Sequence, residues 1–263
     1  HYGMARRGLI APGFRADIVV LDDLVNFNAH RVYIEGKLVA KDQEPLFSPG
    51  PIDDSKVLDT VHIGDISPEK LVVKAESDNI RVIEIVPDQI LTKNLNLPAK
   101  VVNGEVVSDT GRDILKVAVI ERHKASGRIG VGFVRGFGLK KGAVSSTVAH
   151  DSHNLIVLGT NDEDMMALIK HTVEMKGGQA VACDGKILAD LPLPIGGLMS
   201  DEPLTAVKDK LEAMFSASKE LGSALHSPFM TMAFLALPVV PELKITDEGY
   251  VDVNAFKHVP VGV

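Results

Sequence analysis

Residues 114–121 read Ile-Leu-Lys-Val-Ala-Val-Ile-Glu, and this stretch sets the fold class. Apolar residues, several of them β-branched, fill it almost without interruption, which is typical of a β-strand. Shorter runs of the same kind precede it, separated by Gly, Pro, Asn or Asp: residues 61–63, 71–73, 80–86 and 100–102. The sequence therefore predicts a β-rich unit that begins near residue 58.

Two helices are expected after these strands. Asn161 can cap the first, which runs to residue 175 with acids in its first turn and apolar residues at steps of three and four. The second opens at residues 201–203. Between the helices, Asp184-Gly185 is a strong signal for a two-residue hairpin turn. Because strands and helices do not alternate regularly, we predict a mixed α/β (α+β) fold.

The first part of the chain has a different character. Residues 16–21 and 32–40 predict short strands, and residues 1–41 are too few to form an independent core. Turn and breaker residues without a periodic apolar face predict a linker over residues 42–57. We therefore expect a small β-sandwich remnant (1–41), a linker (42–57) and a C-terminal α/β domain (58–263). Because the chain opens without an initiator Met, we also expect it to be a piece of a longer protein.

Composition excludes several classes of protein. The chain has 263 residues, 45% hydrophobic and 24% charged, with 28 Lys plus Arg against 35 Asp plus Glu. The resulting formal charge of -7, without basic blocks interleaved with aromatics, argues against a nucleic-acid partner. The most apolar run, residues 229–240, is broken by Pro238 and is too short to span a membrane. One cysteine, Cys183, cannot form an intrachain disulfide, so we expect a reducing compartment and a cytoplasmic protein.

A glycine-rich passage, residues 127–142, follows the deciding strand. Its glycines allow close approach of backbone segments, but their spacing matches neither a dinucleotide fingerprint nor a phosphate loop. Metal-binding motifs with paired histidines are also absent from the sequence, as is the Gly-x-Ser-x-Gly motif of α/β-hydrolases. We therefore predict no metal site on this chain.

The densest polar cluster is Ala-His-Asp-Ser-His-Asn at residues 149–154, between two apolar segments. Imidazole, carboxylate, hydroxyl and amide groups this close together can donate, accept and transfer protons near neutral pH. An ordinary polar loop whose side chains cap backbone groups explains the same residues equally well.

A second candidate follows the deciding strand at residues 120–123, Ile-Glu-Arg-His. A strand end that leads into a glycine-rich loop is a common location for functional residues. Alternation along a strand predicts that one of Glu121 and Arg122 points inward and the other outward. The alternative is a surface ion pair. A third segment, residues 193–201, is a glycine-containing loop before a helix that either receives a polar ligand or simply turns the chain.

Longer stretches carry a family resemblance. Residues 8–21 resemble the segment that follows the barrel in metal-dependent amidohydrolases. Four further stretches look like the C-terminal domain of bacterial and archaeal adenine deaminases: Val-Ile-Glu-Arg-His (119–123), Gly-Phe-Val-Arg-Gly-Phe-Gly-Leu (132–139), Thr-Val-Ala-His-Asp-Ser-His-Asn (147–154) and Leu-Pro-Leu-Pro-Ile-Gly-Gly-Leu-Met-Ser (191–200). The resemblance extends over essentially the whole chain.

The resemblance implies hydrolysis of adenine to hypoxanthine and ammonia by an enzyme with manganese or iron in a TIM barrel outside this chain. It implies that the present segment covers the active site and contacts adenine. Its partners are then the barrel and, because a partial sandwich needs cover, further copies of itself in a homo-oligomer. The candidate catalytic residues are His150, Asp151 and His153. The candidate substrate-binding residues are Asn154, Glu121 and His123.

Two other functions stay open. The first is another amidohydrolase with a similar tail that acts on a different cyclic amide or amidine. The second is a non-catalytic module that binds a purine or a partner chain without any metal.

Overall fold

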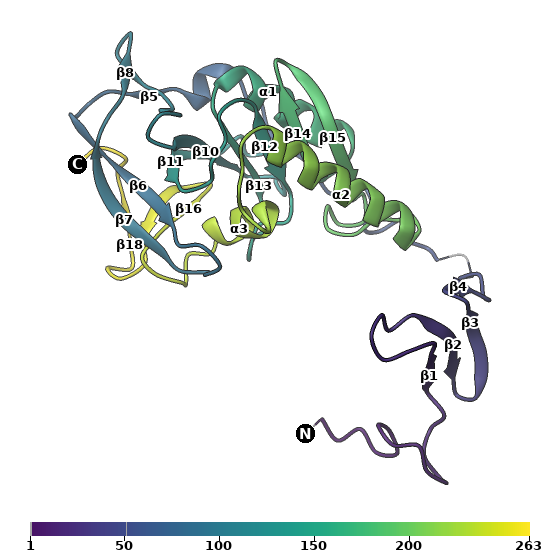
Figure 1. The fold of residues 1–263 in the computed structure, drawn as a ribbon. Helices are drawn as coiled ribbons and strands as arrows, with labels where there is room; N and C mark the ends of the chain where they lie inside the picture. Colours follow the sequence, from purple (N-terminus) through teal and green to yellow (C-terminus); the bar gives the residue numbers. More distant parts are fainter. Residues whose placement is uncertain (1, 51) are drawn as a thin grey trace. The chain divides into compact units, whose positions relative to one another are not determined.

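The computed structural model describes residues 2–50 and 52–263 (Figure 1). Residues 1 and 51 lie outside the described residues. The predictions for residue 1 as part of the sandwich remnant and for residue 51 as part of the linker therefore lie outside them too. The chain divides into two compact units, with the second running from Asp54 to Val263. This division falls inside the predicted linker, residues 42–57.

The first unit is one antiparallel sheet of four strands in the order β1-β2-β3-β4. Its strands are β1 (Ile18–Leu21), β2 (Ala29–Ile34), β3 (Lys37–Lys41) and β4 (Glu44–Pro45). The short strand β4 lies in the range predicted as linker, because residues 44 and 45 pair with the end of β3. Among residues 2–50 none is buried. A single small sheet has no second layer on which to bury its apolar side chains.

The second unit is built on an eight-stranded sheet in the spatial order β15-β14-β12-β13-β10-β11-β6-β7 (Figure 1). Its strands are β6 (Asn79–Ile85), β7 (Thr92–Pro98), β10 (Ile114–Ile120), β11 (Ile129–Arg135), β12 (Ala143–Ser146), β13 (Leu155–Gly159), β14 (Gly178–Cys183) and β15 (Lys186–Pro192). Neighbouring strands are antiparallel except β11 and β6, which run parallel. The apolar stretch at residues 114–120 forms β10, near the middle of this sheet.

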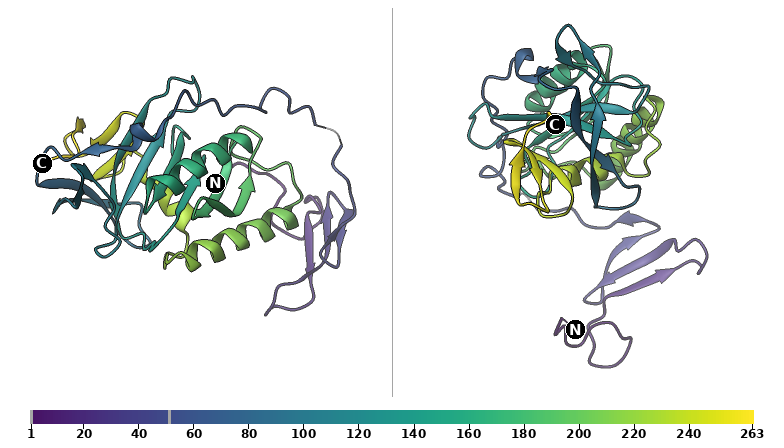
Figure 2. Two further views of the ribbon diagram at one scale, coloured as in Figure 1. Left: turned by 90° about the horizontal axis from the view of Figure 1, so that it is seen from above. Right: turned by 90° about the vertical axis from the view of Figure 1, so that its left-hand side faces the viewer.

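Helices cover both faces of the sheet (Figures 1 and 2). Val117 and Val119 of β10 pack in one core with residues of α2 (Leu204–Glu220) and α3 (Pro228–Leu235). Ala118 and Ile120 pack in another core with residues of α1 (Asp162–Glu174). All seven residues of β10 are buried, so its nearly continuous apolar sequence follows from cover on both faces. The predicted α+β fold is confirmed.

Two local predictions are also confirmed. The Asn161 side chain accepts a hydrogen bond from the Asp164 N–H at 2.8 Å and caps α1. Asp184 and Gly185 join β14 to β15 with φ values of 53° and 71°, as a tight hairpin turn of this composition requires. The second helix begins at Leu204, with Pro203 as its N-cap. No helix in the described residues is both long and apolar enough to cross a membrane.

Other strand predictions were wrong or incomplete. Residues 61–63 form no strand, because the His62 N–H donates to the Arg122 carbonyl (2.8 Å) instead of to a ladder. Residues 71–73 lie at the end of a 3₁₀ helix, η1 (Pro68–Leu71), and the start of β5 (Val73–Lys74). The strand predicted at residues 100–102 is present as β8 (Val101–Val102). The sequence did not reveal α3, β9 (Glu105–Val106), β16 (Leu243–Thr246), β17 (Gly249–Asp252) or β18 (Lys257–Val259).

The glycine-rich passage contains strand β11, and its glycines do allow close backbone approach. A Cβ at Gly130 would collide with the Thr246 carbonyl, and one at Gly132 would collide with the Tyr250 ring. The parallel β6–β11 pairing covers only two residue pairs. On the N-terminal side of this pairing, the buried Tyr250 hydroxyl accepts a hydrogen bond from the Phe133 N–H. The same hydroxyl lies 2.8 Å from the Phe133 carbonyl and 3.1 Å from the Arg81 carbonyl. The phenol therefore bridges β6 and β11 at residues where the two strands are not paired with each other, and its burial raises its pKa.

Tyr250→Phe is expected to lower the free energy of unfolding by about 1–2 kcal/mol, because the Phe133 N–H loses its partner in the interior. Urea unfolding of the two proteins measures the difference. Tyr33→Phe in β2 is a matched control, since Tyr33 is only partly buried. Equal losses from the two substitutions would contradict the bridging role of Tyr250.

Candidate functional site

Two of the predicted candidate segments lie side by side at one end of the neighbouring strands β10 and β13. Strands β10 and β13 are antiparallel, and Ile120 at the end of β10 pairs with Leu155 at the start of β13. The residues that follow β10 therefore lie beside those that precede β13. This topology brings residues 121–123 next to residues 150–154.

Three hydrogen bonds fasten the two segments together. The Arg122 N–H donates to Asn154 Oδ1 (3.4 Å), and the Arg122 Nε–H donates to the His153 carbonyl. His123 Nε2 lies 2.7 Å from the Ser152 carbonyl, which makes this nitrogen the donor and leaves Nδ1 as the acceptor of the ring. The loop that carries the two predicted imidazoles is thus positioned by residues 122 and 123.

Arg122 is a buried cation, with 1% of its surface exposed. Its Nη1 and Nη2 donate to the carbonyls of Thr60 (3.3 Å) and Gly196 (3.0 Å), and no described carboxylate pairs with it. Burial lowers the pKa of its guanidinium group. The alternative of a surface ion pair at residues 121 and 122 is therefore wrong.

The predicted alternation of Glu121 and Arg122 was also wrong, since both residues are buried. Strand β10 ends at Ile120, and the alternation of a pleated strand does not continue into the turn that follows.

Glu121 holds that turn. Its Oε1 accepts the backbone N–H groups of His123 (2.5 Å) and Lys124 (2.9 Å). Its Oε2 accepts the backbone N–H (3.1 Å) and the hydroxyl (2.7 Å) of Ser126. Burial by itself raises the pKa of the carboxyl group, but these four hydrogen bonds outweigh it and lower the pKa to about 2. Both oxygens are thus engaged within the protein.

Glu121→Gln is expected to destabilise the chain by about 2 kcal/mol at pH 7. The folded-state pKa is about 2 and the ordinary value 4.5, so this stabilisation is complete above about pH 4.5 and is lost as the pH falls toward 2. Urea unfolding of both proteins between pH 7 and pH 3 should show their difference shrinking with acidity. A difference that stays constant over this range would contradict the role of the carboxylate charge.

His150 and His153 approach each other on this loop. Their ring centroids are 5.5 Å apart, and the His150 ring also lies 4.9 Å from the Phe234 ring of α3. His153 has a left-handed backbone (φ 51°), and its buried Nδ1 has no hydrogen-bond partner. Burial lowers the pKa of His153, His150 and Arg122 lower it further, and Asp151 opposes them. The environment of His153 therefore favours the neutral form of its imidazole.

The remaining residues of the loop differ in exposure. Asp151 is exposed and lines a cavity of about 350 Å³ together with residues of β17 and of the segment after α3. Asn154 is buried, and its Nδ2 donates to Asp247 Oδ1 (3.0 Å), while Asp247 Oδ2 accepts from Arg128 Nε (2.8 Å). Sequence reasoning missed Asp247, because it lies more than ninety residues from Asn154 and no motif surrounds it.

The loop at residues 193–201 supports the same region. The Gly196 carbonyl accepts from Arg122, and the Gly197 carbonyl accepts from the Thr147 hydroxyl (2.6 Å). The carbonyls of this loop therefore fix neighbouring segments. Across residues 2–50 and 52–263, no group of three or more His, Cys, Asp or Glu side chains could hold a metal ion.

Comparison with known proteins gives one consistent result. A family model, the adenine deaminase C-terminal domain, matches residues 89–257. The chain is 50% identical over 257 residues to "Adenine deaminase 2" of Carboxydothermus hydrogenoformans, covering 97% of this chain and 45% of that protein. It is 49% identical over 260 residues to "Adenine deaminase" of Desulfatibacillum aliphaticivorans, covering 98% and 45%. It is 47% identical over 262 residues to "Adenine deaminase" of Methanothrix thermoacetophila, covering 99% and 46%.

The chain spans about half the length of the curated relatives it matches. The family model covers more than half of the chain and includes the strands, loops and helices that build the candidate site. The chain belongs to the adenine deaminase C-terminal domain family.

Proposed function

We propose that this chain is part of an enzyme that hydrolyses adenine to hypoxanthine and ammonia. The observation that carries the proposal is its similarity, along nearly its whole length, to proteins named adenine deaminase. The reaction replaces the exocyclic amino group at C6 of the purine by oxygen from water.

The metal proposed for this reaction, manganese or iron, lies outside the present chain. The described side chains do not fit such an ion, because they provide no group of three or more ligating residues. The contribution of this segment is therefore derived from its own hydrogen-bonding groups alone.

We infer that the loop at residues 150–154 covers the active site and contacts adenine. The purine edge presents an amino donor and ring-nitrogen acceptors, so it is matched by groups that both donate and accept. In its neutral form His153 can do either, and the exposed carboxylate of Asp151 can accept from an amino group. These two residues and His150 form the proposed catalytic set, in which acid and base are not distinguished.

The three residues predicted to bind substrate have a supporting role in this proposal. Both oxygens of Glu121 and both ends of the Asn154 amide already have partners inside the protein. His123 donates to the loop carbonyl at Ser152 but retains Nδ1 as an acceptor. We therefore assign Glu121 and Asn154 to positioning the loop, and His123 to positioning with a remaining capacity to bind adenine.

The proposed partners are the barrel, further copies of the chain, and adenine. None of residues 2–50 in the first unit is buried. This supports the proposal that another layer of protein packs on this sheet. The lone cysteine, Cys183, supports a reducing compartment, for which we propose the cytoplasm.

The test begins with the native protein that contains this sequence, identified by intact mass. Incubated with adenine and added manganese, this protein should produce hypoxanthine and ammonia in equimolar amounts. Chromatography measures the hypoxanthine, and a coupled assay measures the ammonia. Release of ammonia from guanine, cytosine or a hydantoin, but not from adenine, would instead support another amidohydrolase.

A second measurement separates an enzyme part from a binding module. Calorimetry of the 263-residue chain with adenine and a chelator should detect no binding, since the proposed site is completed by the barrel. Metal-independent binding to this chain, in a native protein that releases no ammonia, would favour a purine-binding module.

A further inference from the structure

A cavity of about 650 Å³ lies at the other end of β10 from the candidate site. Strand β10 has seven residues, so about 20 Å separate the two places. The cavity forms beside the short parallel pairing of β11 with β6, where Gly136 (φ 98°) leads the chain away from the sheet. Its volume lies within the range of small-molecule sites in proteins.

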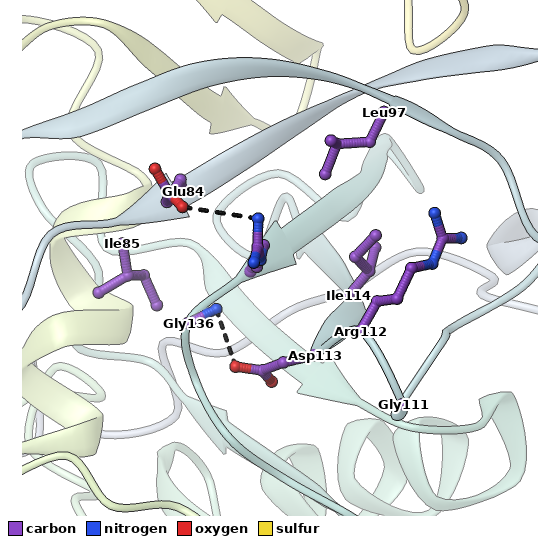
Figure 3. Close-up of a pocket in the computed structure, with 9 residues that line it drawn as sticks. Glu84, Ile85, Leu97, Gly111, Arg112, Asp113, Ile114 and Gly136 are labelled. Atoms are coloured by element: carbon purple, nitrogen blue, oxygen red, sulfur yellow. Dashed lines mark hydrogen bonds and ion pairs between the residues drawn. The ribbon is translucent and has the colours of Figure 1, made fainter.

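The floor of this cavity is apolar. Ile85 of β6 and Ile114 of β10 are buried, and Leu97 of β7, which packs in one cluster with Ile114, is half-buried. Figure 3 shows these three side chains around the cavity, with Arg112 next to Ile114. A flat apolar group placed on this floor would be removed from water on one face.

Two arginines line the cavity and keep unused donors. Arg135 makes no side-chain hydrogen bond in the described part of the chain, and its Nη1 is 3.8 Å from Glu84 Oε1. Glu84 is shared with Lys93, whose Nζ lies 3.5 Å from its other oxygen. Arg112 donates from Nε to Asp109 (2.7 Å) and from Nη1 to the Pro98 carbonyl (2.9 Å). Among the described residues, its Nη2 keeps its donors free for a ligand.

The remaining acid in the lining, Asp113, is hydrogen-bonded to the backbone and not to these arginines. Both oxygens of Asp113 accept backbone N–H groups, one from Gly138 (2.9 Å) and one from Gly136 (3.0 Å). Figure 3 shows the hydrogen bond from Gly136. These bonds hold the carboxylate against the loop that leaves β11. The cavity therefore combines an apolar floor with guanidinium donors that lack full partners, which is the chemistry of an anion site.

We propose that this cavity binds a small organic anion that carries a carboxylate or phosphate group on a flat apolar ring system. The anion pairs with Arg135 and with Nη2 of Arg112, and the ring packs on Ile85, Leu97 and Ile114. This site is independent of the proposed deamination, because none of its lining residues belongs to the candidate site.

Calorimetry with four probes tests the proposal: adenosine monophosphate, benzoate, adenosine and inorganic phosphate. The chain should bind adenosine monophosphate or benzoate, and the one bound identifies phosphate or carboxylate as the anion. Adenosine lacks the charge and phosphate lacks the ring, so each should bind about tenfold more weakly or not at all. Failure of both ring-bearing anions to bind, or equally tight binding of adenosine or phosphate, would overturn the proposal.

Variants locate the bound probe. Arg135→Gln and Arg112→Gln should each weaken binding about tenfold, while Arg31→Gln in β2 serves as a matched control with unchanged affinity. All three side chains are exposed, so folding should be preserved. Amide NMR shifts on the unmodified chain give a second test, since Gly111 and Gly136 line the cavity. Unchanged affinity in both cavity variants, or shifts confined to other regions, would contradict the site.

Discussion

Replacing Arg122 by methionine is expected to lower the free energy of unfolding by about 3 kcal/mol. Methionine keeps an unbranched chain as far as the position of Nε but has no donors, so the carbonyls of Thr60, His153 and Gly196 lose their partner together. Unpaired carbonyl groups in the interior are costly, and three segments far apart in sequence lose a common fastening point. Urea unfolding at pH 7 measures the loss.

Two neighbouring glycines provide a matched control for this contact. Gly196 and Gly197 have nearly equal φ values of 67° and 70°, so alanine has a similar backbone cost at each. A Cβ at Gly196 meets nothing within 4 Å, whereas one at Gly197 would lie 2.8 Å from Arg122 Nη1. We expect Gly197→Ala to be more destabilising than Gly196→Ala by at least about 1 kcal/mol.

The difference between the two glycine variants should disappear when Arg122 is alanine, because the clash then has no partner. A difference that persists without the guanidinium would show that Gly197 is required for another reason. An Arg122→Met protein as stable as the original would mean that the hydrogen bonds of the guanidinium only offset the cost of its burial.

For the adenine hydrolysis proposed above, replacing His153 by asparagine in the native protein is expected to lower kcat/KM for adenine about 100-fold. Asparagine tolerates the left-handed backbone at this position (φ 51°), and the backbone carbonyl that accepts from Arg122 is retained. The free energy of unfolding should therefore change by less than about 1 kcal/mol, while the imidazole is lost.

The division of this effect between kcat and KM tells the role of His153. A loss mainly in kcat indicates a contact made in the transition state, and a loss mainly in KM indicates substrate binding. His171→Asn on α1 is a matched control, because His171 pairs only with Asp190 on the described surface. Full activity in the His153 variant would remove this residue from the proposed catalytic set.

Local patterns in the sequence were sufficient for elements whose stability is local. The α1 cap at Asn161 and the hairpin at Asp184-Gly185 depend on groups only a few residues apart, and both were predicted correctly. The strand at residues 114–121 was predicted because burial on both faces leaves a continuous apolar run. The polar cluster at residues 150–154 was also apparent, because its side chains are adjacent in the chain.

Elements that depend on distant partners were not predicted. Strand β11 contains Gly130 and Gly132, which weaken a local strand signal but are required by the close approach of Thr246 and Tyr250. Helix α3 lies in a short run that is apolar on all sides, so its periodicity could not distinguish a helix from other buried segments.

The sequence by itself determined the α+β class, the central strand and the polar loop with its two imidazoles, because each depends on residue type and short-range spacing. Only the tertiary structure decided the environment of that loop. Arg122 became a buried fastening point instead of a surface ion, since antiparallel pairing of β10 with β13 placed it beside His153 and beneath Gly196. The pKa values of Glu121 and His153 follow from that burial and its hydrogen bonds, which no local pattern specifies.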